Sequence, residues 1–204
     1  MYYACLCAGL YQENPVAKKT LDLAEVAGQL EAHKKSRSLP PVHLWKPDFS
    51  GDIDMQIRAD GTWWHEGGQI KRPAMVTMFA SILWHENDEY FLVTPVEKVR
   101  IQVEDAPLFV TEMQVDEVEG QQVLRFITST EDEIVAGVEH LLRVETDPET
   151  EEPSPYIMVR YGMEARLNRN VFYQLAELAY EVDINGQQHL MVDSAGMQFS
   201  LGTL

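Results

Sequence analysis

Short runs of alternating apolar and polar residues, separated by turns that contain glycine, constrain this fold more than any other sequence feature. Ile53, Met55 and Ile57 alternate with polar residues, and the pair Asp60-Gly61 separates them from residues 62–65. Strict alternation is typical of a half-buried strand, and an Asp-Gly pair between two such runs indicates a hairpin. We therefore expect short antiparallel strands to form most of the sheet structure.

Similar patterns predict further strands along the chain. Residues 109–118 and 123–128 flank the turn Glu119-Gly120, and Asn185-Gly186 marks another turn. Apolar or alternating runs predict the remaining strands at 90–94, 99–103, 156–160, 190–192 and 197–201. Residues 145–155 contain five acidic residues and three prolines without apolar periodicity. This segment is expected to be an exposed loop or linker.

Two main amphipathic helices are predicted between these strands. Residues 72–84 place apolar side chains at helical spacing, and Pro73 suits the first helical position. The second helix begins at Asn168 or Asn170 and places apolar residues on one face through position 182. Residues 130–133 have the pattern of a capping box, which predicts a short helix around 134–138. The same periodicity predicts a helix over 20–35.

The same order of elements occurs twice: strand, glycine turn, return strand, helix and two further strands. In this alignment Arg58 corresponds to Arg160, Gly61 to Gly162, and Arg72 to Arg169. Chance similarity of two α+β segments is the alternative. We predict an α+β fold of two similar small domains from an internal duplication, each an antiparallel sheet with one main amphipathic helix. The predicted divisions are a tail and helix at 1–37, a first domain at 38–105 and a second at 106–204, with a cleft between the domains.

An excess of acidic residues narrows the range of partners. The 204 residues include 33 acidic and 16 basic side chains, which gives a net charge of −17. Duplex nucleic acid and anionic membranes attract clustered Lys and Arg, so we expect binding to neither. Residues 104–152 hold fifteen acids against Arg125 and Arg143, a net charge of −13, and leave the rest of the chain nearly neutral.

The two cysteines indicate no disulfide framework. Cys5 and Cys7 are one residue apart, so a bond between them would be strained, and this favours a cytoplasmic protein. The first ten residues lack the basic start and the cleavage pattern of a secretory signal. We interpret residues 1–15 as a loose tail or a gene-calling artefact, with translation starting at Val16.

Catalytic and metal-binding motifs are absent from the sequence. Trp64-His65-Glu66 and Trp84-His85-Glu86 repeat one tripeptide, but their spacing is not that of a metal motif. There is no nucleophile elbow, and the residues after Gly67-Gly68 do not have Walker spacing. We predict neither a metal nor another cofactor, and we favour a binding protein over an enzyme.

The chain contains the strings PVHLWKP at 41–47, GDIDM at 51–55, DGTWWHEG at 60–67, FLVTPVEKVRI at 91–101, EDAP at 104–107, VRYG at 159–162 and NR at 168–169. Together these strings resemble the bacterial domain-of-unknown-function family 1285. The resemblance covers about residues 38–204. It implies a fold built by domain duplication, with a second domain similar to a pleckstrin-homology barrel. It also implies a role in signal transduction, with a small nucleotide-like ligand at the domain interface, but no established reaction.

The scarce basic residues are the main candidates for a ligand site. Lys71, Arg72, Lys98 and Arg100 lie at a predicted helix start and strand end, where they could hold an anion in the cleft with backbone N–H groups. Trp64 could stack on a base. The full candidate set is Trp64, His65, Lys71, Arg72, Lys98, Arg100, Arg160 and Arg169. The alternative is that the equivalent arginines only pair with local carboxylates in each repeat.

These observations predict a cytoplasmic module that binds a small anionic molecule, of which a nucleotide is one kind, between two domains. The alternative is a protein-interaction module that engages a basic partner through the acidic residues 104–152.

Overall fold

The hairpin predicted at Asp60-Gly61 begins the sheet of the N-terminal domain. The computed structural model describes residues 39–203, and in it β1 (Phe49–Ile57) pairs with β2 (Trp63–His65) in antiparallel register. Four more strands complete the sheet: β3 (Gly68–Gln69), β4 (Leu83–Glu86), β5 (Glu89–Val93) and β6 (Lys98–Val103). Their order is β3-β2-β1-β6-β5-β4. The strands predicted around 53–57, 90–94 and 99–103 are thus confirmed.

The central pair of this sheet is parallel, which corrects the expectation of an antiparallel sheet. β1 and β6 run in the same direction, with Phe49 opposite Lys98 and Ile57 opposite Val103. They belong to two separate meanders, β1-β2-β3 and β4-β5-β6, which a helix connects. Strands from two meanders can meet in either direction, and local alternation in the sequence does not encode that choice.

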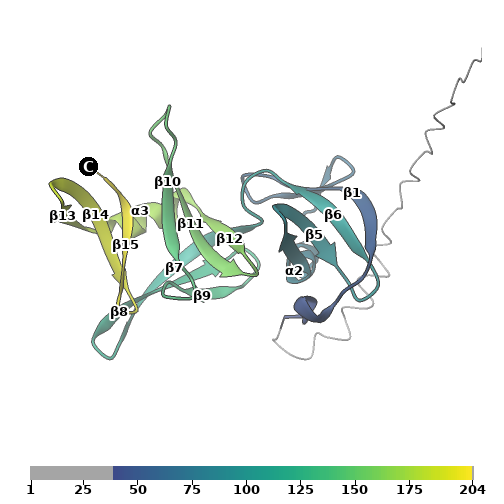
Figure 1. Cartoon of the computed structure of the whole chain (residues 1–204), viewed down its shortest axis with the longest axis horizontal. Helices are drawn as coiled ribbons and strands as arrows, with labels where there is room; N and C mark the ends of the chain where they lie inside the picture. The colour runs from purple at the N-terminus through teal and green to yellow at the C-terminus, as the bar shows by residue number, and fades with distance from the viewer. Residues whose placement is uncertain (1–38, 204) are drawn as a thin grey trace, which may run out of the picture.

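The helix α2 (Pro73–Ser81) covers one face of the sheet and lies on the side of the second domain (Figure 1). Phe79 is fully buried, and its ring stacks on Trp63 with centroids 6.2 Å apart. The helix ends three residues before the predicted end at 84, because Ile82 is its C-cap and Leu83 begins β4. Both residues are buried, so the apolar pattern continues unchanged from helix to strand.

The opposite face of the sheet, which we call the outer face, carries a second and smaller core. The 3-10 helix η1 (Val42–Leu44) leads into this core. Val42, Phe91 and Val93 are buried together, and the indoles of Trp45 and Trp84 pack against them. The N-terminal domain is therefore covered on both faces, by α2 on one side and by the η1 segment on the other.

The C-terminal domain contains two sheets. The larger is formed by β7 (Leu108–Val118), β8 (Gln121–Thr128), β9 (Glu133–Val135), β10 (Leu142–Thr146), β11 (Pro153–Arg160) and β12 (Met163–Leu167), in the order β10-β11-β12-β7-β8-β9. Only β12 and β7 are parallel neighbours in it. The smaller sheet is antiparallel and contains β13 (Tyr180–Ile184), β14 (Gln187–Ser194) and β15 (Met197–Thr203). It lies at the end of the molecule far from the N-terminal domain (Figure 1).

The prediction of a helix around 134–138 is wrong, because Glu133–Val135 form the strand β9 and residues 136–138 are not helical. The hydroxyl groups of Thr128 and Thr130 donate hydrogen bonds to the Asp132 carboxylate, and the Asp132 N–H donates to Thr128 Oγ1 at 2.9 Å. Glu131 has a φ of 67°, which a helix does not allow. The residues with the capping-box pattern therefore close a turn between two strands, an alternative that Thr and Asp side chains offer to the backbone.

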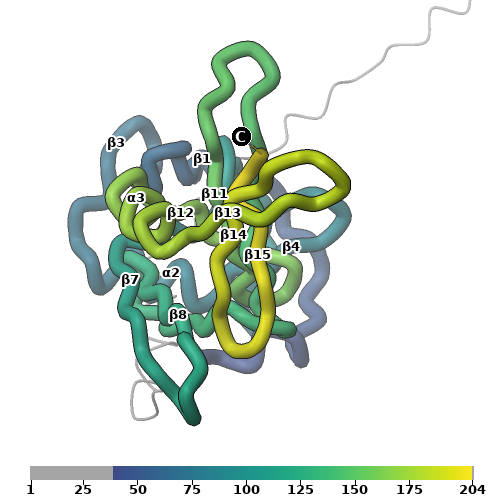
Figure 2. The backbone as a smooth tube through the Cα atoms, turned by 90° about the vertical axis from the view of Figure 1, so that its left-hand side faces the viewer, coloured from purple at the N-terminus to yellow at the C-terminus, as the bar shows by residue number. Residues whose placement is uncertain are grey.

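Only the middle of the segment 145–155 forms the predicted loop. β10 extends to Thr146 and β11 starts at Pro153, so only residues 147–152 form the turn of a hairpin. The Asp147 carboxylate accepts hydrogen bonds at 2.8 Å from the N–H groups of Glu149 and Thr150, and these bonds lower its pKa. The hairpin projects from the body of the molecule in both Figure 1 and Figure 2.

The second predicted helix forms as α3 (Arg169–Glu177), but its predicted extent through position 182 is wrong, because Leu178 is the C-cap and Tyr180–Ile184 form the strand β13. Asn168 is its N-cap, and the Asn168 side chain accepts a hydrogen bond from the Val171 N–H at 2.7 Å. Val171 and Leu175 on its apolar face are buried.

The two halves share an order of elements but not a pattern of strand pairing. In the N-terminal domain β6 joins the sheet of β1, whereas β13, β14 and β15 form a sheet of their own. Internal duplication and the likeness to a pleckstrin-homology barrel stay predictions. The fold class is corrected from α+β with antiparallel sheets to a mostly β structure with mixed sheets and two α-helices within residues 39–203.

One continuous apolar core joins the two domains. Buried residues of the N-terminal domain, such as Met55 and Phe79, belong to the same cluster as Leu124 and Leu175 of the C-terminal domain. No helix among residues 39–203 is both long and apolar enough to cross a membrane. The helix predicted at 20–35, the tail at 1–15 and both cysteines lie outside the described residues.

Candidate functional site

A pocket of about 340 Å³ opens on the outer face of the N-terminal domain, between the η1 segment and strands β4 to β6. Pro40 and Pro41 precede η1, and the Trp45 N–H donates to the Val42 carbonyl at 3.0 Å, which turns the chain across the sheet. Nine side chains line the pocket: Val42, His43, Trp45, Lys46, Pro47, Trp84, Glu86, Val93 and Lys98. Two indoles and two lysines thus surround one cavity.

Lys98 connects the charged and aromatic parts of this pocket. Its Nζ atom lies 2.8 Å from Glu86 Oε2 and 4.2 Å from the centroid of the Phe91 ring. The Lys98 side chain is only 18% exposed. Trp84 Nε1 also donates to Glu86 Oε2, at 3.2 Å. The bonds from Lys98 and Trp84 lower the pKa of Glu86, so this carboxylate is ionised at neutral pH.

The C-terminal domain reaches the edge of the pocket through Tyr161. Tyr161 lies in the turn between β11 and β12, and its ring centroid is 5.1 Å from that of Trp84. The Tyr161 hydroxyl lies 3.3 Å from His43 Nδ1, within hydrogen-bond distance. Gly162 follows with a φ of 71°, and a Cβ atom there would lie 3.3 Å from His85 Nδ1. Two pocket residues, His43 and Trp84, therefore contact the second domain directly.

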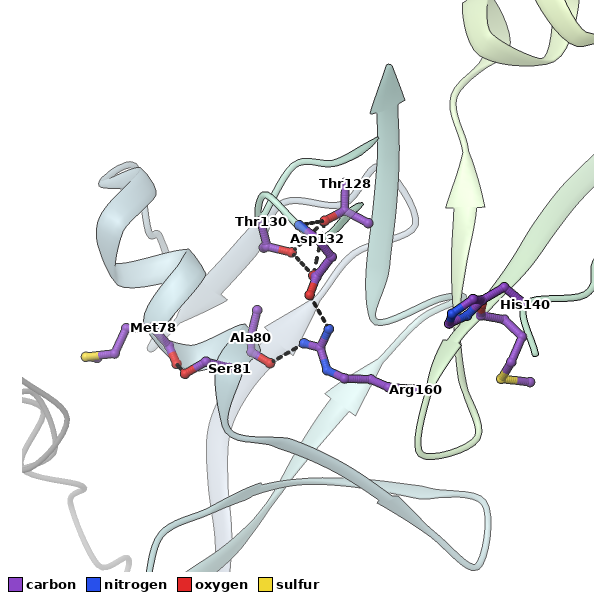
Figure 3. A network of polar contacts seen from close by, with 9 residues as sticks. Met78, Ala80, Ser81, Thr128, Thr130, Asp132, His140 and Arg160 are labelled. Atoms are coloured by element: carbon purple, nitrogen blue, oxygen red, sulfur yellow. Dashed lines mark hydrogen bonds and ion pairs between the residues drawn. The ribbon is translucent and has the colours of Figure 1, made fainter. Parts of the chain in front are cut away.

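Arg160, one of the predicted site residues, joins the two domains instead of lining this pocket. Figure 3 shows its guanidinium between the Asp132 carboxylate and the Ala80 carbonyl. Arg160 Nη1 forms an ion pair with Asp132, and Nη2 donates to the Ala80 carbonyl of α2 at 3.0 Å. The side chains of Arg160 and Asp132 are 12% and 13% exposed. A cation at the C-terminal end of α2 also matches the helix dipole, so Arg160 has a structural role.

Lys98 and Arg100 lie on the outer face, because Val99 and Ile101 between them point into the main core. Arg100 does not line the pocket. It forms two hydrogen bonds with the Asp52 carboxylate, at 2.6 and 3.1 Å, and an ion pair with Glu89. This guanidinium is already bound to two carboxylates.

The other predicted residues lie apart from the pocket lining. Trp64 and His65 are in β2, where Arg58 stacks over the Trp64 ring at 3.7 Å and His65 Nδ1 lies 2.9 Å from the Asp54 carbonyl. Arg72 is the exposed N-cap of α2 and Lys71 is exposed beside it. Arg169 is 73% exposed and 3.9 Å from Glu152. The structure thus brings only Lys98 of the predicted set into the pocket.

Many of the acids in residues 104–152 have partners within the chain. Asp105 accepts hydrogen bonds from Tyr156 at 2.8 Å and from Arg166 at 2.6 Å. Asp116 pairs with Arg125, Asp132 with Arg160, and Glu145 with Arg143. These acids form ion pairs that stabilise the C-terminal domain and its boundary with the N-terminal domain. Residues 104–152 therefore do not form one continuous surface of unpaired acids.

The side chains that sequence reasoning missed include His43, Trp45 and Lys46 in the pocket lining, and Tyr161 at the pocket edge. Their signal was present in the strings PVHLWKP and VRYG, which carry the family resemblance but no recognised motif. Among residues 39–203 no group of three or more His, Cys, Asp or Glu side chains could hold a metal ion.

The fold and the pocket define a two-domain, mostly β protein with an aromatic and cationic cavity beside its domain boundary. Two family models match almost all of the described chain: the N-terminal domain of DUF1285, a domain of unknown function, over residues 40–106, and its C-terminal domain over residues 107–201. The chain belongs to the DUF1285 family.

Solved structures of two bacterial proteins resemble this chain. The crystal structure of a DUF1285 family protein from Silicibacter pomeroyi is 46% identical, with a TM-score of 0.75, and the match covers 83% of this chain and 90% of the other. A DUF1285 family protein from Shewanella baltica is 30% identical, with a TM-score of 0.48, covering 61% and 91% of the two chains. No curated protein matches the sequence.

Proposed function

We propose that this protein is a binding module whose ligand is a small aromatic anion, such as a nucleotide, held in the pocket of the N-terminal domain. The observation that carries the proposal is the combination of two indoles and two lysines around one cavity of about 340 Å³. Small-molecule sites are commonly about 300 to 1,000 Å³, apolar, and supplied with a few polar groups that orient the ligand.

The charge of the pocket favours an anion. Lys46 has no acidic partner within ion-pair distance among residues 39–203, whereas Lys98 forms an ion pair with Glu86. The pocket therefore has two cations for one carboxylate, in a chain whose net charge is −17. A phosphate or carboxylate group would be attracted to Lys46 and Lys98, and an aromatic ring would pack on Trp45 or Trp84.

A signalling role would follow from the position of the pocket. Trp84 and His43 contact Tyr161, and Arg160, the residue before Tyr161, binds both domains. A ligand that moves the Trp84 ring would change the contact with Tyr161, and so favour one arrangement of the domain boundary over another.

Titration of the full chain with AMP, ATP and inorganic phosphate tests the proposal, with tryptophan fluorescence and melting temperature as readouts. We expect at least one nucleotide to change both, and Lys46→Ala and Lys98→Met to weaken its binding about tenfold each, as expected for the loss of a charged hydrogen bond. Arg169→Ala and Arg72→Ala are matched controls that should not change binding, because neither residue lines the pocket. Nucleotide binding that is insensitive to Lys46 and Lys98, or no binding at all, would contradict the proposal.

A further inference from the structure

The smaller sheet of the C-terminal domain has one face packed on the core and one face open to solvent. Val192, Ser194, Phe199 and Leu201 point into the core and are buried. Because side chains alternate along a strand, the residues between them point outward. The outward side chains include Tyr180 and Ile184, which are 37% and 40% exposed. We call this surface the open face; Figure 2 shows its three strands, in yellow, on the side nearest the viewer.

The open face is bordered by an unpaired strand edge. In the part of the chain that the structure describes, β13 pairs with β14 only. Asn185 and Gly186 have φ values of 56° and 85°, so they form the two-residue turn of a β13-β14 hairpin, with Ile184 opposite Gln187. Hydrogen-bonded and non-hydrogen-bonded pairs alternate from that turn. The backbone N–H and C=O groups of Glu181 and Asp183 therefore point away from β14 and are free to pair with another strand.

Charge identifies the kind of strand that fits this edge. Residues 170–204 contain no Lys or Arg, and their four acids are Glu177, Glu181, Asp183 and Asp193. Asp193 accepts a hydrogen bond from the Tyr180 hydroxyl at 2.7 Å, which keeps that ring on the open face. A second copy of this chain, paired through β13, would bring Glu181 and Asp183 close to the same acids, and like charges on paired strands are destabilising.

We propose that β13 receives an extended basic segment of a partner protein as an added strand. Basic side chains of the segment lie beside Glu181 and Asp183, and the apolar side chains that alternate with them cover Tyr180 and Ile184. Main-chain hydrogen bonds to an exposed edge supply affinity in this mode, and alternate side chains supply specificity. The proposal does not depend on the pocket, which lies in the other domain. It places the basic partner on the last strands, not on residues 104–152.

The test measures binding of a fluorescent peptide to the full chain by fluorescence anisotropy. In this peptide Lys alternates with Val or Thr. A control peptide has Glu in place of each Lys. We expect the Lys peptide to bind, more weakly as salt is raised, and the Glu peptide not to bind. Glu181→Pro removes an outward N–H, a position where an edge strand tolerates proline, and should weaken binding about tenfold.

Two further variants separate the edge from a general charge effect. Asp183→Lys should weaken binding, whereas Glu117→Lys, an equal change of charge on the exposed β7-β8 hairpin, should not. Circular dichroism and the melting temperature confirm that each variant is folded. Equal binding of both peptides, or equal binding by the wild type, Glu181→Pro and Asp183→Lys, would overturn the proposal. So would a dimer of the wild-type chain that Glu181→Pro abolishes, because a second copy would then occupy the edge.

Discussion

At the scale of single residues, Tyr161 occupies a backbone position that does not suit it. Its φ is 51° and that of Gly162 is 71°, the geometry of a tight hairpin turn in which Asn or Gly is preferred at the first position. A residue with a Cβ atom is disfavoured there by about 1–2 kcal/mol. The contacts of the Tyr161 ring with Trp84 and His43 offset this cost.

Two substitutions separate the strain at Tyr161 from its ring contacts. Tyr161→Asn loses the contacts but relieves the strain, so its free energy of unfolding should stay within about 1 kcal/mol of the wild type. Tyr161→Val loses the contacts and keeps a branched side chain in the left-handed region, and should be about 2 kcal/mol less stable. Urea unfolding measures both. Equal stability of the two variants would show that backbone strain has no part in the effect.

The ion pair of Arg100 and Asp52 gives the stability a dependence on pH. Hydrogen bonds from Arg100 lower the pKa of Asp52 below its ordinary value in the folded chain. The stabilisation is complete above the ordinary pKa of about 3.9 and is lost as the pH falls through the lower folded value. We expect the free energy of unfolding to decrease from about pH 5 downward, and less steeply in Asp52→Asn. Urea titrations at a series of pH values measure this dependence, and a matched control, Glu117→Gln, should follow the wild type. If the free energy of unfolding of Asp52→Asn falls with pH as steeply as that of the wild type, the ion pair does not cause the pH dependence.

At the scale of elements, the two helices begin in different ways. The side chain of Asn168 caps α3, and its Nδ2 atom also donates to the Thr111 carbonyl at 3.1 Å, which attaches the helix start to β7. The helix α2 begins at Pro73 with no side-chain cap, and Arg72 places a cation at the positive end of its dipole.

The difference in capping predicts changes of opposite sign. Asn168→Ala should lower the free energy of unfolding by about 1 kcal/mol or slightly more, because a capping bond and the bond to Thr111 are lost. Arg72→Asp should raise it by about 0.5–1 kcal/mol, because the carboxylate can cap α2 and interacts favourably with its dipole. Thermal or urea unfolding measures both. A less stable Arg72→Asp would instead indicate that Arg72 has a structural partner.

At the scale of the whole molecule, the Asp60-Gly61 turn of the first domain packs against β7 of the second. Gly61 has a φ of 79°, and a Cβ atom at this position would lie 2.9 Å from the Phe109 side chain. Gly67 has a similar φ of 74°, but a Cβ atom there would meet nothing within 4 Å. The two glycines therefore share a backbone requirement and differ in contact with the other domain.

Alanine at these two glycines measures the contact between domains. Gly67→Ala should cost about 1 kcal/mol through its backbone alone. Gly61→Ala should cost about 1–3 kcal/mol more, because the added methyl group displaces Phe109 from the domain boundary. Since one core joins the domains, both variants should still unfold in a single transition by circular dichroism. Equal costs for both would show that the turn and Phe109 are not held together in solution.

Much of the local structure was predictable because it depends on local chemistry. The Asp60-Gly61 and Asn185-Gly186 turns and the Asn168 cap each use hydrogen bonds or backbone angles within a few residues. The end of α2 and the turn at Asp132 were predicted wrongly, because Leu83 and Arg160 gain partners that are distant in the sequence. Of the candidate site residues, only Lys98 lines the pocket, since outward-facing residues on one strand look alike in a sequence.

The sequence by itself determined the short strands, the two amphipathic helices, the charge of the chain and its family, because periodicity, turn residues and characteristic strings are local properties. Only the tertiary structure decided which strands meet in parallel, which arginine joins the two domains, and which side chains surround a cavity. The physical reason is that these features come from contacts between segments far apart in the chain. Tyr161 and Trp84 are 77 positions apart in the sequence, and packing alone places their rings 5.1 Å from each other.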